Sequence, residues 1–206
     1  MKKNKISKNW INKNARDIYV KRSKLEGYRS RAVYKLQEID SKFKIFKNGS
    51  YVIDLGAAPG SWSEFVSRKI KNSKILSIDI KEMEKIPNTF QIKGDFMDEN
   101  YQKKIKEYFG KKVDVVISDM AVNTTGNKSI DSLLTGELCI EAINFSKEIL
   151  KSNGQFVSKI FMGSSFNEII SHAKKIFKSA KMFKPMASKK DSKESFIVCS
   201  YLRDIK

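Results

Sequence analysis

The stretch YVIDLGAAPGS, from Tyr51 to Ser61, constrains the fold of this 206-residue chain more than any other. Its first three residues favour a β-strand, and Asp54 stands at the carboxyl end of that strand. The residues that follow are small enough for a ligand to approach the main chain: Gly56, Ala57, Ala58 and Gly60. Ligands of open α/β sheets bind at the carboxyl ends of the strands, beside the first tight turn. The stretch therefore predicts a strand, a ligand-binding turn and a helix that begins near Trp62, with Ser61 as its N-cap.

The order of the small residues bears on the class of ligand. A dinucleotide-binding turn has the pattern G-x-G-x-x-G, whereas Gly56 is followed here by Ala57 and Ala58, which disfavours a bound pyrophosphate. Two more acids, Asp79 and Asp95, follow the next two predicted strands. Carboxylates at such strand ends can accept hydrogen bonds from a bound ligand. Each acid alone could equally be a helix N-cap or part of a solvated turn, but three acids at successive strand ends favour one shared binding site.

Predicted strands and helices alternate along the chain, which is typical of a doubly wound α/β sheet with helices on both faces. The strands are expected at 51–54, 74–79, 89–93, 113–118, 154–160, 180–184 and 195–202. The helices are expected at 31–43, 61–70, 98–109, 131–150 and 166–177. The last two strands are joined too tightly for a parallel crossover, so we expect an antiparallel pair at one edge of a mixed seven-stranded sheet.

Length and composition agree with one domain that spans residues 1–206, since a chain of this length with 40% apolar residues can build a substantial core. No apolar run is long enough to cross a bilayer and no signal peptide is recognisable, so we expect a cytoplasmic protein. Cys139 and Cys199 lack a CxxC pattern, which predicts two buried side chains rather than a metal site or a disulfide framework. No coiled-coil pattern is present, which favours a monomer. We assign no function to His172, the only histidine.

Positive charge is concentrated at the amino terminus. The chain carries 41 Lys and Arg against 23 Asp and Glu, and residues 1–35 alone hold twelve basic residues against Asp17 and Glu26. A basic arm over residues 1–30 suits an RNA partner, since such charges release counterions from a polyphosphate. Four aromatic residues interleaved with these charges could stack on unpaired bases: Trp10, Tyr19, Tyr28 and Tyr34. A lysine-rich composition, as in proteins of AT-rich genomes, would explain the total charge but not its clustering.

Four charged residues stand out as candidates for chemistry. Asp119 follows the predicted strand 113–118 and should reach the same rim as the ligand-binding turn. Lys159 lies inside an apolar strand, where an ammonium is costly to desolvate without an acidic partner or a function. Glu194 stands just before the final strand, and Lys35 lies on the first predicted helix. Taken individually, Lys35 and Glu194 are explained more simply as solvated charges.

In combination these features resemble a known enzyme family, the FtsJ-type or RrmJ-like ribose 2′-O-methyltransferases of large-subunit ribosomal RNA. In that family a K-D-K-E tetrad is catalytic, and its members are matched here by Lys35, Asp119, Lys159 and Glu194. The resemblance covers nearly the whole chain and rests on YRSRAVYKL from Tyr28, DLGAAPGSW from Asp54, SDMA from Ser118, KIF from Lys159 and KESF from Lys193. Two departures are Val122, where a proline is usual, and Ser61, where a second glycine is common.

The resemblance implies the Rossmann-like fold of class I S-adenosylmethionine-dependent methyltransferases, with S-adenosylmethionine as the cofactor and no metal. It implies cofactor contacts at Gly60, Trp62, Asp79, Asp95 and Asp119. Asp79 would hold the ribose, Asp95 the adenine, and Asp119 would lie near the methionine end. The ring of Trp62 is explained equally well as an ordinary core aromatic.

The implied reaction is in-line attack of a ribose 2′ oxygen on the methyl of the sulfonium, which needs alignment and removal of one proton. Lys159 would accept that proton, Asp119 would orient its amine, and Lys35 and Glu194 would position the ribose. A Lys159 that stays charged would only steer an oxygen lone pair. By resemblance, the target is a uridine in the A-site loop of 23S RNA within the large ribosomal subunit. Two alternatives stay open: a 2′-O-methyltransferase of transfer RNA or of an mRNA cap, and a non-catalytic RNA-binding protein of ribosome assembly.

Overall fold

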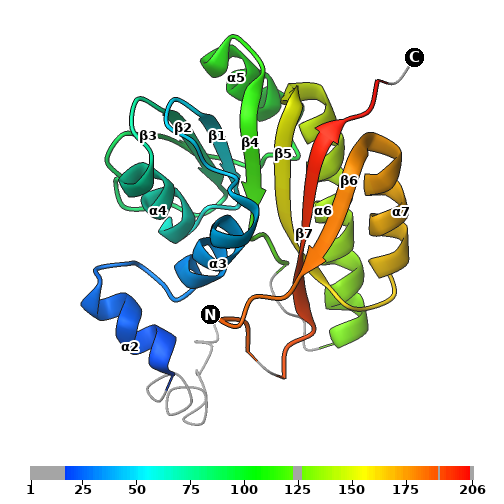
Figure 1. The fold of residues 1–206 in the computed structure, drawn as a ribbon, viewed down its shortest axis with the longest axis horizontal. Helices are drawn as coiled ribbons and strands as arrows, with labels where there is room; N and C mark the ends of the chain where they lie inside the picture. Colours follow the sequence, from blue (N-terminus) through cyan, green and yellow to red (C-terminus); the bar gives the residue numbers. More distant parts are fainter. Residues whose placement is uncertain (1–16, 123–126, 190, 205–206) are drawn as a thin grey trace, which may run out of the picture.

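A mixed sheet forms the centre of the computed structural model, which describes residues 17–122, 127–189 and 191–204. The sheet has seven strands in the order β3-β2-β1-β4-β5-β7-β6 (Figure 1). The strands are β1 Tyr51–Leu55, β2 Lys74–Asp79, β3 Thr89–Lys93, β4 Val113–Ser118, β5 Leu150–Phe161, β6 Phe177–Phe183 and β7 Glu194–Leu202. Neighbours from β3 to β5 are parallel, whereas β7 runs antiparallel to both β5 and β6. The predicted α/β fold, with its mixed sheet and antiparallel last strand, is confirmed.

Helices cover both faces of this sheet, as the alternating pattern predicts. They are α2 Ile18–Leu25, α3 Val33–Phe43, α4 Ser61–Lys69, α5 Glu99–Phe109, α6 Lys128–Ile149 and α7 Phe166–Ile176. Buried side chains of α5, α6 and α7 belong to one apolar cluster, and those of α3 and α4 belong to another. The central strands β1, β2, β4, β5 and β7 serve both clusters, because successive side chains point to opposite faces. On β5, Phe156 lies in the first cluster and Val157 in the second.

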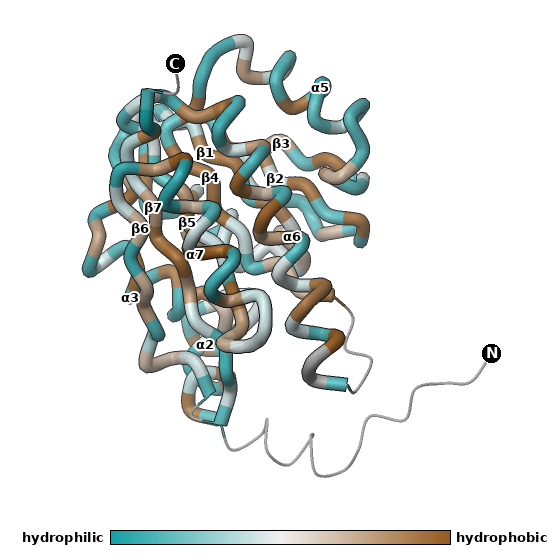
Figure 2. Tube along the Cα trace, turned by 90° about the vertical axis from the view of Figure 1, so that its right-hand side faces the viewer, coloured by the Kyte–Doolittle hydropathy of each residue, from teal (hydrophilic) through white to brown (hydrophobic). Residues whose placement is uncertain are grey.

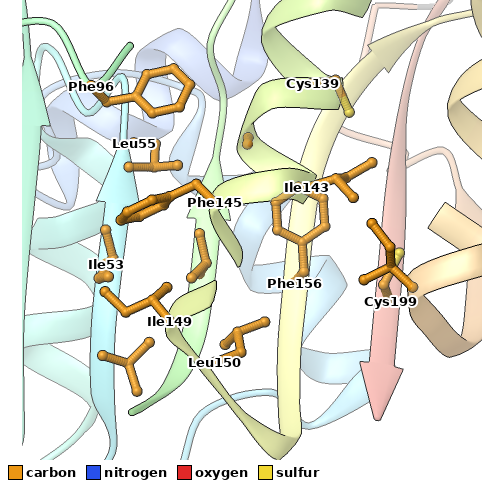
Figure 3. Close-up of a cluster of buried hydrophobic side chains, with 14 of the residues drawn as sticks. Ile53, Leu55, Phe96, Cys139, Ile143, Phe145, Ile149, Leu150, Phe156 and Cys199 are labelled. Carbon is orange, nitrogen blue, oxygen red and sulfur yellow. The ribbon is translucent and has the colours of Figure 1, made fainter. Parts of the chain in front are cut away.

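The first cluster fills the space between the sheet and α6. Figure 3 shows Phe145 and Ile149 of α6 close to Ile53 of β1, with Phe156 and Cys199 farther along the sheet. Cys139 and Cys199 are both buried, as expected. In Figure 2 the central strands are mostly hydrophobic, whereas α5 is largely hydrophilic. The apolar strands therefore form the interior, and the helices shield them with one face each.

Several element boundaries differ from the predicted ones. β5 begins at Leu150 rather than at residue 154, because Leu150 pairs with Val113 and a register shift then accommodates the residues up to Gln155. β6 begins at Phe177 rather than at residue 180, because Phe177 pairs with Leu202 on β7. Strand pairing thus recruits residues that the sequence pattern assigned to turns or to a helix end.

The helix starts differ as well. α3 begins at Val33 rather than at residue 31. The carbonyl groups of residues 30–32 accept hydrogen bonds from the N–H groups three residues later, which is the pattern of a turn rather than of an α-helix. α6 begins at Lys128, three residues before the predicted start. The predicted N-cap at Ser61 is wrong: Gly60 caps α4 at φ +103°, and the Ser61 hydroxyl instead shares a 2.8 Å hydrogen bond with the Ser30 hydroxyl.

Part of the predicted basic arm is a docked helix, whereas residues 1–16, with Trp10, lie outside the described residues. Asp17 caps α2 by accepting a 3.0 Å hydrogen bond from the Tyr19 N–H. The Tyr19 and Tyr34 rings pack with their centroids 5.4 Å apart. Tyr34 is only 2% exposed, so the expectation that it stacks on RNA bases is wrong.

No helix within the described ranges is both long and apolar enough to cross a membrane.

Candidate active site

A cavity of about 330 Å³ opens at the carboxyl ends of the parallel strands. It is lined by the turn after β1, the ends of β2, β3 and β4, and one residue of α6. The lining residues are Gly56, Ala58, Ile78, Asp79, Ile80, Lys81, Gly94, Asp95, Phe96, Met97, Asp119, Met120, Ala121, Val122 and Leu138. Three of the five expected cofactor-binding residues, Asp79, Asp95 and Asp119, therefore meet at one cavity.

The turn after β1 forms one wall of this cavity and depends on Gly56. The Gly56 and Ala57 N–H groups donate to the Ile78 carbonyl at 2.9 and 3.1 Å, which draws the turn towards β2. Gly56 has φ +69°, and a Cβ atom there would lie 2.0 Å from Cγ of Met120. Only glycine therefore fits at this point of the wall.

Asp79 ties the turn to the loop after β2. One of its carboxylate oxygens accepts from the Ala58 N–H at 2.9 Å and the other from the Lys81 N–H at 2.8 Å. Because a carboxylate oxygen has more than one lone pair, both can also accept from a ligand. Asp95, which also lines the cavity, accepts a 2.9 Å hydrogen bond from the Met97 N–H.

The other two expected cofactor-binding residues, Gly60 and Trp62, are not among the residues that line the cavity. The Trp62 indole is 3% exposed, donates a 2.8 Å hydrogen bond to the Ala32 carbonyl, and lies 5.7 Å from the Phe196 ring. Its ring is thus a core aromatic of the α3–α4 face. Gly60 and Trp62 stand at the start of α4, where the first main-chain N–H groups have no partner within the helix.

The four candidate catalytic side chains meet beside the cavity, although they come from four separate segments. The Lys159 ammonium lies 2.9 Å from Oδ1 of Asp119 and donates a 2.5 Å hydrogen bond to the Asp119 carbonyl. The Lys35 ammonium lies 3.8 Å from Oδ2 of Asp119 and donates to Oε2 of Glu194 at 2.8 Å. Asp119 therefore stands between two lysines, and it also lines the cavity.

The paired side chains are largely buried. Only 9% of the Lys159 side chain and 19% of the Asp119 side chain are exposed. Burial alone would raise the pKa of Asp119, but Lys159 and Lys35 outweigh it and lower the pKa below the ordinary carboxyl value. Burial alone would lower the pKa of Lys35, but Asp119 and Glu194 outweigh it and raise that pKa. The site therefore holds Asp119 as an anion and Lys35 as a cation.

Asp54 lies behind the turn rather than in the cavity lining. It is 1% exposed, and its Oδ2 accepts a 2.6 Å hydrogen bond from the Ser63 hydroxyl. Burial raises the pKa of Asp54 to about 7, with Asp119 and Asp79 adding to the effect. Asp54 can therefore gain a proton near neutral pH.

Several residues of the site were not predicted. Ile80 and Met97 line the cavity and are 61% and 42% exposed, and Met120 closes it against Gly56. Each lies one or two residues after a predicted acid, so its position near the carboxyl end of a strand is the sequence signal that could have indicated a place in the site. Among the described residues, no group of three His, Cys, Asp or Glu side chains could hold a metal ion.

Comparison with known proteins identifies the family. The FtsJ-like methyltransferase model matches residues 28–202. A protein of Pelagibacter ubique (strain HTCC1062) named ribosomal RNA large subunit methyltransferase E is 66% identical over 203 residues, which cover 98% of this chain and 100% of that protein. A protein of Rickettsia akari (strain Hartford) with the same name is 43% identical over 198 residues, 93% of this chain and 87% of that protein.

The fold is shared with a solved structure. A Plasmodium falciparum protein described as a ribosomal RNA methyltransferase superposes with a TM-score of 0.75 at 33% identity, covering 85% of this chain and 98% of that one. The resemblance drawn from the sequence motifs is thus confirmed, and the chain belongs to the FtsJ-like methyltransferase family.

Proposed function

We propose that this protein transfers the methyl group of S-adenosylmethionine to the 2′-hydroxyl of a ribose in large-subunit ribosomal RNA. The observation that carries the proposal is Asp119, which lines the cavity and pairs with Lys159 and Lys35 at the same time. A cofactor in the cavity and a ribose at the lysines would then meet at one point. The names of the two curated relatives support ribosomal RNA of the large subunit as the substrate.

The cavity suits S-adenosylmethionine, because about 330 Å³ falls within the usual range of small-molecule sites. Asp79 would accept from the ribose hydroxyls, Asp95 from the adenine amino group, and Ile80 and Met97 would contact the adenine rings. Asp119 would lie near the methionine end. When bound, the cofactor supplies an activated methyl group on a sulfonium.

Trp62 would contribute to cofactor binding through the main chain, whereas Gly60 would contribute by shaping the turn, because its N–H already donates to the Ala57 carbonyl at 2.6 Å. The N–H groups at the start of α4 lack helical partners, and the amino end of a helix favours a carboxylate such as that of the methionine portion. The buried Trp62 ring would then contribute only by packing.

On the substrate side, Lys159 would accept the 2′-hydroxyl proton when its amine is neutral. Asp119 would hold that amine in place, with support from the hydrogen bond between Lys159 and the Asp119 carbonyl. Lys35 and Glu194 form a hydrogen-bonded pair whose remaining donors and acceptors could position the ribose. All four groups come from one chain, which supports a monomer as the active form. The protein would act in the cytoplasm, where ribosomes are assembled.

The direct test is incubation with methyl-labelled S-adenosylmethionine and unmodified large ribosomal subunits, followed by digestion of the RNA. We expect label on a ribose 2′ oxygen, and mapping should locate it at a uridine of the A-site loop. Bound cofactor without transfer to subunits, but with transfer to transfer RNA or capped RNA, would identify a different substrate. Bound cofactor with no transfer to any RNA would favour a binding protein.

The role of Lys159 is tested by substitution. Lys159→Ala should lower the transfer rate by ~10²–10⁴-fold without changing cofactor affinity, because a positioned base contributes about this much and Lys159 does not line the cavity. Lys151→Ala is the matched control on the same strand, since Lys151 is 41% exposed and pairs with Asp114 instead. An increase of rate with pH that survives in Lys159→Ala would rule out Lys159 as the base.

A further inference from the structure

Glu194 is held through both carboxylate oxygens, and only one of these contacts involves Lys35. Oε2 accepts from the Lys35 ammonium at 2.8 Å, and Oε1 accepts from the Ser188 hydroxyl at 2.9 Å. Ser188 belongs to the loop between β6 and β7 and is 5% exposed. A glutamate carboxyl group rotates readily about its last bond, so a contact at a single oxygen would leave its plane free. The Ser188 hydroxyl therefore determines the orientation of the carboxylate.

The loop that carries Ser188 is fixed to α3. The Glu38 carboxylate accepts from the Met186 N–H at 2.6 Å through one oxygen and from the Ala187 N–H at 2.8 Å through the other. The Arg31 guanidinium donates to the Ala187 carbonyl, and Ala187 is fully buried. Ser188 follows directly, so its position depends on these contacts.

Glu38 and Lys35 lie on the same face of α3, because residues three apart on a helix are neighbours. One helix thus determines both contacts of Glu194. Lys35 reaches Oε2 directly, and Glu38 reaches Oε1 indirectly through the loop and Ser188. Neither Ser188 nor Glu38 lines the cofactor cavity.

We propose that Ser188 is a positioning residue that orients Glu194 towards the substrate ribose, and that Glu38 holds the loop from which Ser188 acts. The inference rests on the proposed function, in which Glu194 and Lys35 position the ribose. It assigns a specific task to the β6–β7 loop, which is to hold Glu194 rather than to contact the cofactor.

The test uses the full-length protein and measures methyl transfer at saturating cofactor together with cofactor affinity. Ser188→Ala should lower kcat by about tenfold, the usual effect of a lost hydrogen bond to a charged group, and leave the cofactor Kd unchanged. In a protein that already carries Glu194→Ala, the Ser188→Ala substitution should have no further effect, because its acceptor is gone.

Ser195→Ala is the matched control. Ser195 is adjacent to Glu194, is 5% exposed, and donates its 3.1 Å hydrogen bond to the Phe183 carbonyl rather than to the carboxylate of Glu194. It should change thermal stability about as much as Ser188→Ala and leave kcat within about twofold. Glu38→Ala should lower kcat as Ser188→Ala does, and combining the two should add little.

The outcomes separate this inference from the proposed function. If Ser188→Ala matches the wild type while Glu194→Ala is impaired, the inference is wrong and the proposed function stands. If Ser188→Ala is equally harmful with and without Glu194, its role is general stability and the inference is also wrong. If the wild type itself makes no 2′-O-methylated product, the proposed function fails and the inference fails with it.

Discussion

Asp54 shows how a single buried residue can make the stability of the fold depend on pH. The ordinary carboxyl pKa is 3.8, and burial raises that of Asp54 to about 7. Folding therefore favours the protonated form, and the stabilisation is fully present below about pH 4 and is lost as the pH rises through about 7. Above that pH, the folded protein carries a buried anion. This anion accepts a hydrogen bond from the Ser63 hydroxyl, which also contacts the Ser77 hydroxyl.

We expect Asp54→Asn to remove this dependence. Its free energy of unfolding relative to the wild type should rise between pH 5 and pH 8 by about 2–3 kcal/mol, measured by denaturant unfolding across that range. Ser63→Ala removes a hydrogen bond that lowers the pKa of Asp54, so it should move the loss of stability to higher pH. A difference between Asp54→Asn and wild type that stays constant with pH would contradict the raised pKa.

Gly56 is a second residue whose role rests on local geometry. Gly56→Ala would bring a Cβ atom to 2.0 Å from Met120 at the cavity wall, so we expect cofactor affinity to fall by at least ~10-fold in a calorimetric titration. Gly49→Ala is the control, since Gly49 has a similar φ of +80° but no atom within 4 Å of its Cβ position. It should lose about 1 kcal/mol of stability from backbone strain and bind the cofactor normally. Equal affinities in the two variants would refute the packing argument.

At the scale of the elements, α2 is the least expected part of the fold. Its sequence has no clear apolar stripe, and both of its ends are fixed by side-chain contacts, some of them with residues distant in the sequence. Asp17 caps the helix and also pairs with Arg31, and the Tyr34 hydroxyl donates to Glu26 at its other end at 3.0 Å. The helix is therefore stabilised mainly by docking on α3, which periodicity in the sequence does not reveal.

Asp17 supports α2 both as its N-cap and through its ion pair with Arg31. Asp17→Ala should destabilise the helix by about 1 kcal/mol, and amide hydrogen exchange of residues 18–25 should accelerate by about fivefold or more. Asp98→Ala provides the control, because Asp98 caps α5 in the same way, through the Asn100 N–H at 2.8 Å. It should accelerate exchange in α5 and leave α2 unchanged. Unchanged exchange of α2 in Asp17→Ala would show that neither the cap nor the pair with Arg31 stabilises the helix.

At the scale of the whole molecule, the dominant property is the net charge of +18. Residues 1–16 carry six Lys or Arg and no Asp or Glu. If these cations contact RNA, removing them should reduce the slope of log affinity against log salt concentration by up to about 4 for a single-stranded target. RNA binding to the full-length and truncated chains at several salt concentrations would measure this. Cofactor affinity is the control and should not change, because the cavity is lined by residues 56–138.

The arrangement of the sheet follows from the sequence because its signals are local. Each of the strands β1 to β4 is followed within a few residues by a tight turn or an acid, and these signals can be read directly from the sequence. The tight connection before β7 is sufficient to predict an antiparallel pair. Asp79, Asp95 and Asp119 could be assigned to one rim for the same reason: parallel strands present their carboxyl ends at a common edge.

Only the tertiary structure determines which residues far apart in the chain contact one another. Lys35 and Glu194 are 159 residues apart, and the residues around each of them do not indicate that the two side chains share a hydrogen bond. The burial of the Trp62 ring, the extension of β5 back to Leu150, and the Glu38 contact with the β6–β7 loop likewise depend on which surfaces meet. Local sequence determines backbone geometry and side-chain direction, whereas the energy of a buried charge or ring depends on neighbours that only folding brings together.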